Sequence, residues 1–169
     1  MKIKLSDIKS GFKDKFFDIP TNSIPSRGTS FKHNNIHCTL TSFTFQSNRY
    51  GLKGYIDTTI GHKCVRCLDA FESKIHLAIE ISLENNSIEA SLDPESENVI
   101  KFFNSTYEID IGSILADFIE LEEPMNPLCK NDCLGLCVVC GINKSKTSCN
   151  CKFDEKNEVW DKLKDLEIK

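Results

Sequence analysis

Residues 64–83, CVRCLDAFESKIHLAIEISL, join a pair of cysteines to the clearest strand pattern in this chain. Seven residues at alternate positions, six of them apolar, share one face of an extended segment: Phe71, Ser73, Ile75, Leu77, Ile79, Ile81 and Leu83. Period two is typical of a β-strand that buries one face. The stretch therefore predicts a long strand that starts at a tight turn between Cys64 and Cys67.

The same alternation occurs in two stretches before this one. Residues 36–45 alternate with one slip near Ser42, and residues 52–64 alternate up to the first cysteine of the pair. Because the connections are short, we expect antiparallel pairing, with Cys64 and Cys67 at the tip of a hairpin. Two long strands that meet at a CxxC turn are typical of half a zinc ribbon.

Shorter elements are expected in the second half of the chain. Residues 99–103 and 107–109 predict short strands, and residues 110–123 predict a helix with Asp110 at its N-cap. In this helix apolar residues recur at the i, i+3, i+4, i+7 spacing of a one-sided helix. Near the end of the chain, residues 155–166 predict a second amphipathic helix.

The fold class that we predict is α+β: an antiparallel β-sheet or open barrel with a few helices and a cysteine-rich, zinc-ribbon-like C-terminal module. Residues 1–35 contribute a short amphipathic start and a loop rich in proline, serine and asparagine. Residues 1–127 would form the mainly antiparallel β domain, with the CxxC hairpin tip and one helix at about 110–123. Residues 128–169 would form the zinc-binding module and the terminal helix, packed with the first part as one unit.

Composition narrows the class of protein. The chain has 169 residues, of which 40% are hydrophobic, enough for a packed core, and its formal net charge is −4. Acidic residues concentrate in residues 84–123, which hold eleven of them against one basic residue, Lys101. The chain therefore lacks the strongly basic profile of a stand-alone nucleic-acid binder, and any RNA contact must use a local patch or a protein partner.

The start of the chain bears on its compartment. The sequence MKIKLSDIKSGFKDKF has charges every few positions and no apolar stretch of the kind found in secretory signals. No segment approaches the roughly 18 apolar residues of a membrane helix. We expect a protein of a reducing compartment: the cytoplasm, or the plastid stroma if the gene is carried by a plastid. In such a compartment, clustered cysteines indicate metal ligands or redox groups rather than disulfides.

The nine cysteines are the strongest chemical signal. Cys38 lies in the middle of a predicted strand among apolar neighbours, which leaves eight, enough for two tetrahedral sites of four thiolates. These candidate metal ligands are Cys64, Cys67, Cys129, Cys133, Cys137, Cys140, Cys149 and Cys151. Gly141 directly follows the second CxxC pair, where a positive φ often closes the turn. The pattern predicts bound Zn²⁺, with two ions per chain.

Two groupings of the eight thiols are open. One grouping forms a site from Cys64, Cys67, Cys129 and Cys133, and a second site from Cys137, Cys140, Cys149 and Cys151. The other grouping joins the two CxxC pairs in one ribbon and leaves the remaining four to share a site. The spacing favours the first grouping mildly, because its second site closes only a short loop.

Other uses of the thiols compete with zinc binding. The CxxxCxxC spacing from Cys133 to Cys140 matches iron–sulfur sites of radical enzymes, but such a motif normally opens a large α/β barrel, and few residues follow it here. A simpler electron-transfer cluster stays open. A thioredoxin-like role for Cys64 and Cys67 needs a βαβ context, and here strands flank the pair. Secreted disulfides are disfavoured because no signal peptide is present.

Catalytic residues are not apparent. The histidines His33, His37, His62 and His76 are scattered, and only His62, two residues before Cys64, is placed to join a metal site. No nucleophile elbow, phosphate-binding glycine loop or metalloprotease motif occurs. Thiolates that fill a structural metal site leave no open coordination position for catalysis. We therefore predict that the protein is not an enzyme.

Three segments together resemble one family. CVRCLDAF at residues 64–71, EIDIGSILADFIELEEP at residues 108–124 and PLCKNDCLGLCVVCGINKSKTSCNC at residues 127–151 are similar, in order and distance, to the YceD family. These are the large ribosomal RNA subunit accumulation proteins of bacteria and plastids. The resemblance implies a role in making or protecting large-subunit ribosomal RNA, without a known catalytic activity. It also favours the first cysteine grouping, because some members keep the upstream pair and lose much of the last cluster.

The leading hypothesis is a non-enzymatic ribosome-biogenesis factor that supports synthesis, processing or stability of large-subunit ribosomal RNA. Its partner would be precursor ribosomal RNA or a ribosome-assembly protein, with no membrane and no small-molecule substrate. The candidates for RNA contact are basic residues near the cysteines: Lys63, Arg66, Lys130, Lys144 and Lys146. The alternative is a zinc-ribbon interaction module whose acidic stretch, residues 84–123, engages a basic ribosomal or assembly protein without RNA contact. A redox enzyme or RNA nuclease is a third hypothesis, for which the sequence offers no histidine pair or carboxylate cluster.

Overall fold

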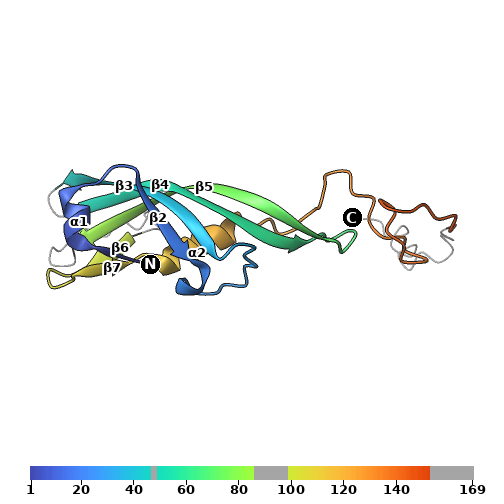
Figure 1. The fold of residues 1–169 in the computed structure, drawn as a ribbon, viewed down its shortest axis with the longest axis horizontal. Helices are drawn as coiled ribbons and strands as arrows, with labels where there is room; N and C mark the ends of the chain where they lie inside the picture. Colours follow the sequence, from blue (N-terminus) through green and yellow to red (C-terminus); the bar gives the residue numbers. More distant parts are fainter. Residues whose placement is uncertain (47–48, 86–98, 153–169) are drawn as a thin grey trace, which may run out of the picture.

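The structure, a computed structural model, describes residues 1–46, 49–85 and 99–152. In chain order the elements are β1 (Lys2–Lys4), α1 (Leu5–Ser10), β2 (Lys15–Pro20), the 3-10 turn η1 (Thr21–Ser23), β3 (Asn35–Gln46), β4 (Arg49–Lys63), β5 (Ala70–Asn85), β6 (Val99–Phe102), β7 (Glu108–Asp110) and α2 (Gly112–Glu122). The described part is elongated, with the sheets and helices at one end and the cysteine-rich residues at the other (Figure 1).

The larger sheet has the strand order β2-β3-β4-β5-β6. Its first four strands pair antiparallel, as the alternating pattern predicts, and the sheet is open rather than closed into a barrel. β6 differs from the expectation, because it pairs parallel to β5, with Ser82 opposite Val99. Parallel pairing needs a connection of a dozen residues or more, and the chain between Asn85 and Val99 has that length.

β4 and β5 form a long hairpin that positions the first cysteine pair. Their register runs without a break from Arg49 opposite Glu84 to Lys63 opposite Ala70. The far end of this hairpin extends beyond the other strands, so the predicted CxxC turn lies at its tip (Figure 1). The hairpin therefore carries half of a candidate metal site away from the body of the molecule.

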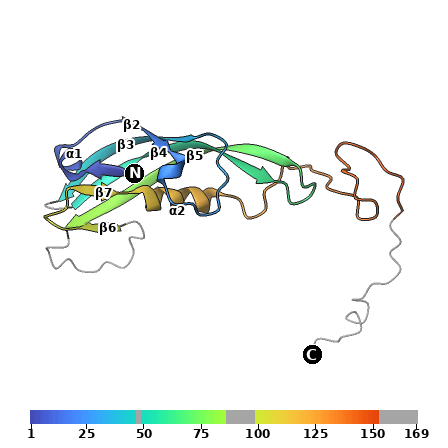
Figure 2. The same ribbon diagram turned by 60° about the horizontal axis from the view of Figure 1, so that its bottom comes forward.

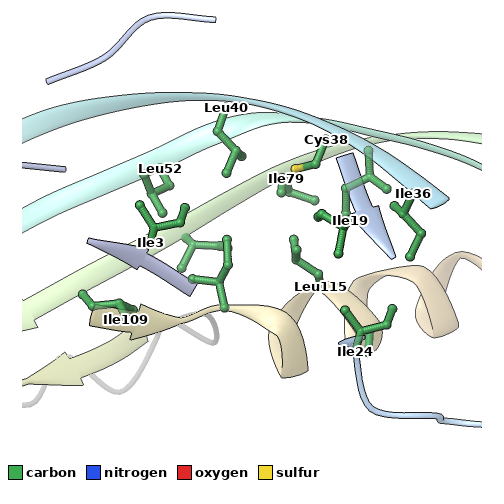
Figure 3. Close-up of a cluster of buried hydrophobic side chains, with 14 of the residues drawn as sticks. Ile3, Ile19, Ile24, Ile36, Cys38, Leu40, Leu52, Ile79, Ile109 and Leu115 are labelled. Carbon is green, nitrogen blue, oxygen red and sulfur yellow. The ribbon is translucent and has the colours of Figure 1, made fainter. Parts of the chain in front are cut away.

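One face of the larger sheet, called here the inner face, is covered by α2 and by the two-stranded β1–β7 sheet (Figure 2). Alternate residues of the long strands point to this side, and isoleucine and leucine dominate the buried cluster between the layers (Figure 3). Leu115 on α2 and Ile79 on β5 both lie in it. Cys38 on β3 is fully buried in the same cluster, and burial, with the Asp57 charge, raises the pKa of its thiol to about 12. Cys38 is thus a core residue.

The predicted helix after residue 110 is confirmed, but it starts later than a helix capped by Asp110 would. Its N-cap is Ile111, and Asp110 Oδ1 accepts a hydrogen bond from the Gly112 N–H at 2.9 Å. That N–H, together with the N-terminal ammonium 3.0 Å away, lowers the pKa of Asp110. The carboxylate therefore still stabilises the start of the helix, from one residue farther out.

The first 35 residues hold more regular structure than the predicted loop. β2 pairs with β3 along its whole length, from Lys15 opposite Leu40 to Pro20 opposite Asn35. Two consecutive phenylalanines hide the alternation in this strand, because Phe16 points to the open face of the sheet and is 60% exposed. The predicted helix at 155–166 lies outside the described residues. Among the helices that the structure describes, none is long and apolar enough to cross a membrane.

Candidate metal centres

Eight sulfur atoms gather into two groups at the far end of the molecule. We define the proximal site as Cys64, Cys67, Cys129 and Cys133, and the distal site as Cys137, Cys140, Cys149 and Cys151. Within each group, all four Sγ atoms lie within 4.8 Å of one another. The structure thus brings the thiols together in the grouping that the sequence favours, and it separates the two CxxC pairs.

Distances inside the proximal site fit a single metal ion. Cys64 Sγ lies 3.7 Å from Cys133 Sγ, and Cys67 Sγ lies 3.6 Å from Cys129 Sγ. A tetrahedron with Zn–S bonds of about 2.3 Å has edges of about 3.8 Å. A disulfide would bring two sulfurs to about 2.05 Å. An iron–sulfur cluster would hold them farther apart, because iron and sulfide atoms lie between its ligands.

The proximal site is enclosed by apolar side chains. Cys64, Cys67 and Cys133 are buried, and Phe71 and Leu128 pack against them. The site joins the hairpin tip to the chain after α2, since two of its four thiols come from each. A metal ion held here would cross-link two segments that no strand pairing connects within the described residues.

Backbone N–H groups are directed at thiols of both CxxC pairs. The N–H of Cys129 is the main cause that lowers the pKa of Cys64 to about 6, and the N–H of Cys140 does the same for Cys137. A thiolate is the form of cysteine that binds metal. The lowered pKa values of Cys64, in the proximal site, and Cys137, in the distal site, therefore favour the thiolate that binds metal.

Other thiols of the two sites have raised pKa values. Burial, followed by the neighbouring Cys67 thiol, raises the pKa of Cys129 to about 12. A hydrogen bond with Cys140 raises the pKa of Cys151 to about 12. Several thiolates cannot share so small a volume without a counter-charge, and a divalent cation supplies it. The donor set fits a soft metal ion.

The distal site is more open than the proximal one. Cys140 and Cys151 are exposed, and of its four cysteines only Cys137 is buried. Gly141 has a φ of +73°, as predicted for the residue after the second CxxC pair, and its N–H donates to the Cys137 carbonyl at 2.8 Å. This turn holds the first two distal thiols in place.

Arg66, at the hairpin tip, contacts the chain that leads from the proximal site to the distal site. The Leu136 N–H donates to the Arg66 carbonyl at 3.0 Å, and Arg66 Nη1 donates to the Cys133 carbonyl at 3.1 Å. Gly135 has a φ of +71°, and a Cβ there would lie 3.1 Å from the Arg66 carbonyl oxygen. Glycine therefore permits the close approach of the distal segment to the hairpin tip.

Asp69 is a supporting residue that sequence reasoning does not identify. Its carboxylate accepts hydrogen bonds from Asn143 Nδ2 at 2.9 Å and from Lys146 Nζ at 2.8 Å. The Lys146 ammonium is the main cause that lowers the pKa of Asp69, and Asp69 in turn raises the pKa of Lys146. The sequence signal is slight: an acidic residue two positions after a CxxC pair.

The predicted RNA-contact residues have unequal surroundings. Lys63, Lys130 and Lys144 are exposed near the two sites. Arg66 Nη1 donates to the Cys133 carbonyl within the proximal site, and Lys146 Nζ pairs with Asp69 beside the hairpin tip. A structural role thus accounts for two of the five, and contact with RNA stays a prediction for all of them.

His62 joins neither sulfur group. Its Nε2 lies 2.9 Å from Ser73 Oγ, its Nδ1 lies 4.0 Å from a Glu123 carboxylate oxygen, and its ring packs beside Phe71. His37 and His76 lie on the face of the larger sheet opposite α2, far along the strands from the CxxC tip.

A sheet whose long hairpin carries half of a four-thiol site, with a second four-thiol site beyond it, defines a small cysteine-rich β protein with two candidate metal centres. The chain belongs to the YceD family, described as Large ribosomal RNA subunit accumulation protein YceD, and the match covers residues 52–167. This range contains most of β4, all of β5 and all eight thiols of the two sites. The resemblance seen in the sequence is confirmed.

Curated relatives include plant and mycobacterial proteins. The chain is 28% identical over 135 residues to the maize chloroplastic "Large ribosomal RNA subunit accumulation protein YCED homolog 1", which covers 64% of this chain and 46% of the relative. The Arabidopsis thaliana protein of the same name is 33% identical over 70 residues, 41% of this chain and 22% of the relative. An uncharacterized Mycobacterium tuberculosis protein is 30% identical over 84 residues, 50% of this chain and 39% of the relative. The chain spans less than half the length of these relatives, and no solved structure matches it.

Proposed function

We propose that this protein is a non-enzymatic factor in ribosome biogenesis that supports the synthesis, processing or stability of large-subunit ribosomal RNA. The observation that carries the proposal is the family match over residues 52–167, which spans both candidate metal centres. The proposed place of action is where ribosomes assemble, the cytoplasm or the plastid stroma.

In this proposal each four-thiol site holds one Zn²⁺ with a structural role. Four thiolates would complete the tetrahedron and leave no open position for a substrate, so the metal would stabilise the fold rather than take part in a reaction. The S–S distances of 3.7 and 3.6 Å and the N–H groups directed at the first thiol of each CxxC pair support this role. The proposed protein has two parts, a β domain (1–127) and a zinc-binding module (128–169).

The proposed partner is precursor large-subunit ribosomal RNA, and the alternative partner is a basic ribosome-assembly protein. Exposed Lys63, Lys130 and Lys144 support an RNA contact, because lysines at the surface neutralise phosphates. The acidic side chains that would engage a basic protein include Asp117, Glu120 and Glu122 on the exposed side of α2. Of these, Asp117 already pairs with Arg27 at 2.8 Å.

Depletion of the protein in its host tests the function. We expect the ratio of large-subunit to small-subunit ribosomal RNA to fall, and the wild-type gene to restore it. A Cys64→Ser gene should fail to restore it, whereas Cys38→Ala should succeed because Cys38 is a core residue outside both sites. An unchanged ratio on depletion would contradict the proposed function.

Ultraviolet crosslinking in cells separates the two kinds of partner. Crosslinks concentrated on one region of precursor large-subunit RNA support direct contact and identify its position. Crosslinks at background level, together with co-purification of a basic protein after nuclease treatment, would support the alternative partner.

A further inference from the structure

The face of the larger sheet opposite the core, called here the outer face, carries exposed aromatic residues. Cross-strand partners share a face of a sheet, and the register places Phe16, Thr39, Tyr55 and Ala78 in one row across β2 to β5. Phe16 is 60% exposed and Tyr55 is 51% exposed. Because these two rings share one face of the sheet, the outer face is a candidate binding surface.

The next row along the strands contains two histidines that stack on these rings. It consists of Asp18, His37, Asp57 and His76. The His37 ring stacks on Phe16 at 5.5 Å between centroids, and the His76 ring stacks on Tyr55 at 5.1 Å.

Each of the two histidines contacts a carboxylate on the neighbouring strand. His37 Nδ1 lies 3.2 Å from Asp18 Oδ1, and His76 Nδ1 lies 2.6 Å from Asp57 Oδ1. Each exposed aromatic ring therefore stacks on a histidine ring that a carboxylate holds in place. A ligand that stacks on a ring already held in place loses less rotamer entropy on binding.

A cavity of about 460 Å³ opens on this face beside Tyr55. Its polar lining consists of Asp14, Thr39, Thr41, Lys53, Tyr55 and Glu80. Lys53 Nζ is held over the Phe43 ring, 5.4 Å from its centroid. The cavity thus combines one aromatic ring, three hydroxyl groups, two carboxylates and one ammonium group.

This combination suits an unpaired nucleobase. Bases stack on aromatic side chains of antiparallel sheets, and their edges form hydrogen bonds with hydroxyl groups and carboxylates. Asp14 Oδ1 accepts a hydrogen bond from the Thr41 hydroxyl at 3.1 Å, and a carboxylate has room to accept further bonds. Asp14 and Glu80 would therefore select a base edge that presents N–H donors. Lys53 supplies the positive charge that a flanking phosphate requires.

Three acidic residues of the outer face already have hydrogen-bond or ion-pair partners. Asp18 and Asp57 are engaged by the two histidines, and Glu84 lies 3.2 Å from Arg49. Lys74, on the same face, is exposed. A peptide with an apolar side chain would leave the polar lining of the cavity unpaired, so a nucleobase fits its chemistry better.

We propose that the outer face binds single-stranded RNA, with an unpaired base stacked on Tyr55 and its edge read by Asp14 and Glu80. The proposal rests on the proposed function, because it names the surface through which the protein would meet ribosomal RNA.

The test measures binding of short fluorescent single-stranded RNAs to the metal-loaded full chain by anisotropy. Loss of one stacking contact costs a base about 1–3 kcal/mol, so Tyr55→Ala should weaken binding by about 5- to 150-fold. Tyr55→Phe keeps the ring and should bind like the wild type. Tyr107→Ala removes an aromatic side chain that is 65% exposed and contacts Lys4, away from the outer face, and should leave affinity unchanged.

The outcomes separate the inference from the proposed function. A wild-type protein that binds no RNA would overturn both the RNA contact and the inference. Wild-type binding that Tyr55→Ala leaves unchanged would overturn the inference alone. Equal affinity for an RNA with abasic sites would also overturn it, because only the backbone would then be recognised. Loss of self-association or of a protein partner in Tyr55→Ala, with RNA affinity intact, would assign the face to a protein and overturn the inference.

A second measurement does not depend on the variant's folding. Photocrosslinking of 4-thiouridine RNA to the wild-type protein, followed by peptide mass spectrometry, should yield adducts on the peptides that contain Tyr55 or Phe16. Adducts confined to peptides of the cysteine-rich end would overturn the assignment to the outer face.

Discussion

The Asp69 carboxylate accepts a hydrogen bond from Asn143 Nδ2 at 2.9 Å, although the two residues lie 74 positions apart in the chain. Asp69 follows the CxxC turn of the proximal site, and Asn143 lies in the loop between the cysteine pairs of the distal site. Lys146 Nζ, from the same loop, lies 2.8 Å from the same carboxylate. The Asp69 side chain therefore connects the loop of the distal site to the hairpin tip.

Replacing Asp69 tests this connection. In Asp69→Ala the distal loop loses two hydrogen bonds to the tip, so we expect the amide hydrogens of Leu136 and Lys144 to exchange severalfold faster, with both metal ions retained. Hydrogen exchange read by mass spectrometry and metal analysis measure the two effects. Asp132→Ala is the matched control, because Asp132 is an exposed carboxylate that pairs only at 4.0 Å with Lys130 Nζ of the same loop. Equal exchange rates in the two variants would contradict the role of Asp69.

Removing one proximal thiol should remove one metal ion. Cys64→Ser leaves three thiols in a buried site, so we expect about one zinc less per chain and a loss of folded protein, because metal binding and folding are coupled. Metal analysis and thermal melting measure both. Cys38→Ala should keep the full metal content and lose about 1–2 kcal/mol, as expected when a small buried side chain is shortened. The same metal content in Cys64→Ser and wild type would show that Cys64 is not a ligand.

The two sites should lose metal at different rates. Cys140 and Cys151 of the distal site are exposed, whereas three of the four proximal cysteines are buried. A chelator reaches an exposed site more readily, so metal release followed with a coloured chelator should show a fast and a slow phase of equal size. Cys140→Ser should abolish the fast phase only. A single phase in the wild-type protein would indicate that burial does not control release.

Alkaline pH should destabilise the fold through Cys38. Its thiol keeps its proton to about pH 12 in the folded protein, but an exposed cysteine of the unfolded chain loses its proton near pH 8.5. Between these values the unfolded state binds fewer protons, so the free energy of unfolding falls as pH rises, by up to about 1.4 kcal/mol per pH unit.

Urea unfolding of the metal-loaded protein at pH 8 and pH 10 measures this effect. Other groups titrate alike in wild type and Cys38→Ala, so the difference between the two isolates the buried thiol. We expect the decrease in the free energy of unfolding to be smaller in Cys38→Ala. An identical decrease in both proteins would show that Cys38 does not contribute.

Gly135 and Gly141 offer a matched pair of substitutions. Both have a left-handed backbone, with φ of +71° and +73°, so alanine strains each by a similar amount, about 1 kcal/mol. At Gly135 the new Cβ would also crowd the Arg66 carbonyl, whereas at Gly141 no atom of the described residues lies within 4 Å of it. Gly135→Ala should therefore lower the melting temperature and the rate of metal reloading more than Gly141→Ala. Equal effects of the two substitutions would mean that the backbone at Gly135 moves away from the Arg66 carbonyl without loss of stability.

Much of the fold follows from local pattern. The alternation in residues 36–45, 52–64 and 71–83 predicts three long strands, and the structure confirms them with boundaries shifted by a few residues. The sequence pattern does not predict β2, because Phe16 and Phe17, side by side, conceal period two in a short segment. The parallel pairing of β5 and β6 could not be predicted, because pairing direction depends on where a connection returns and not on the pattern within either strand.

Local spacing along the chain accounts for the chemistry: two CxxC turns, a glycine that closes the second, and enough further thiols for two four-thiol sites. These features depend on spacings of a few residues, which the backbone translates directly into geometry. The tertiary structure selects between the two open groupings of the thiols, because Cys64 meets Cys133 through the length of one hairpin and the path of the chain after α2. It also decided that Phe16 and Tyr55 lie in one row, since strand register, not spacing along the chain, determines which side chains become neighbours across a sheet.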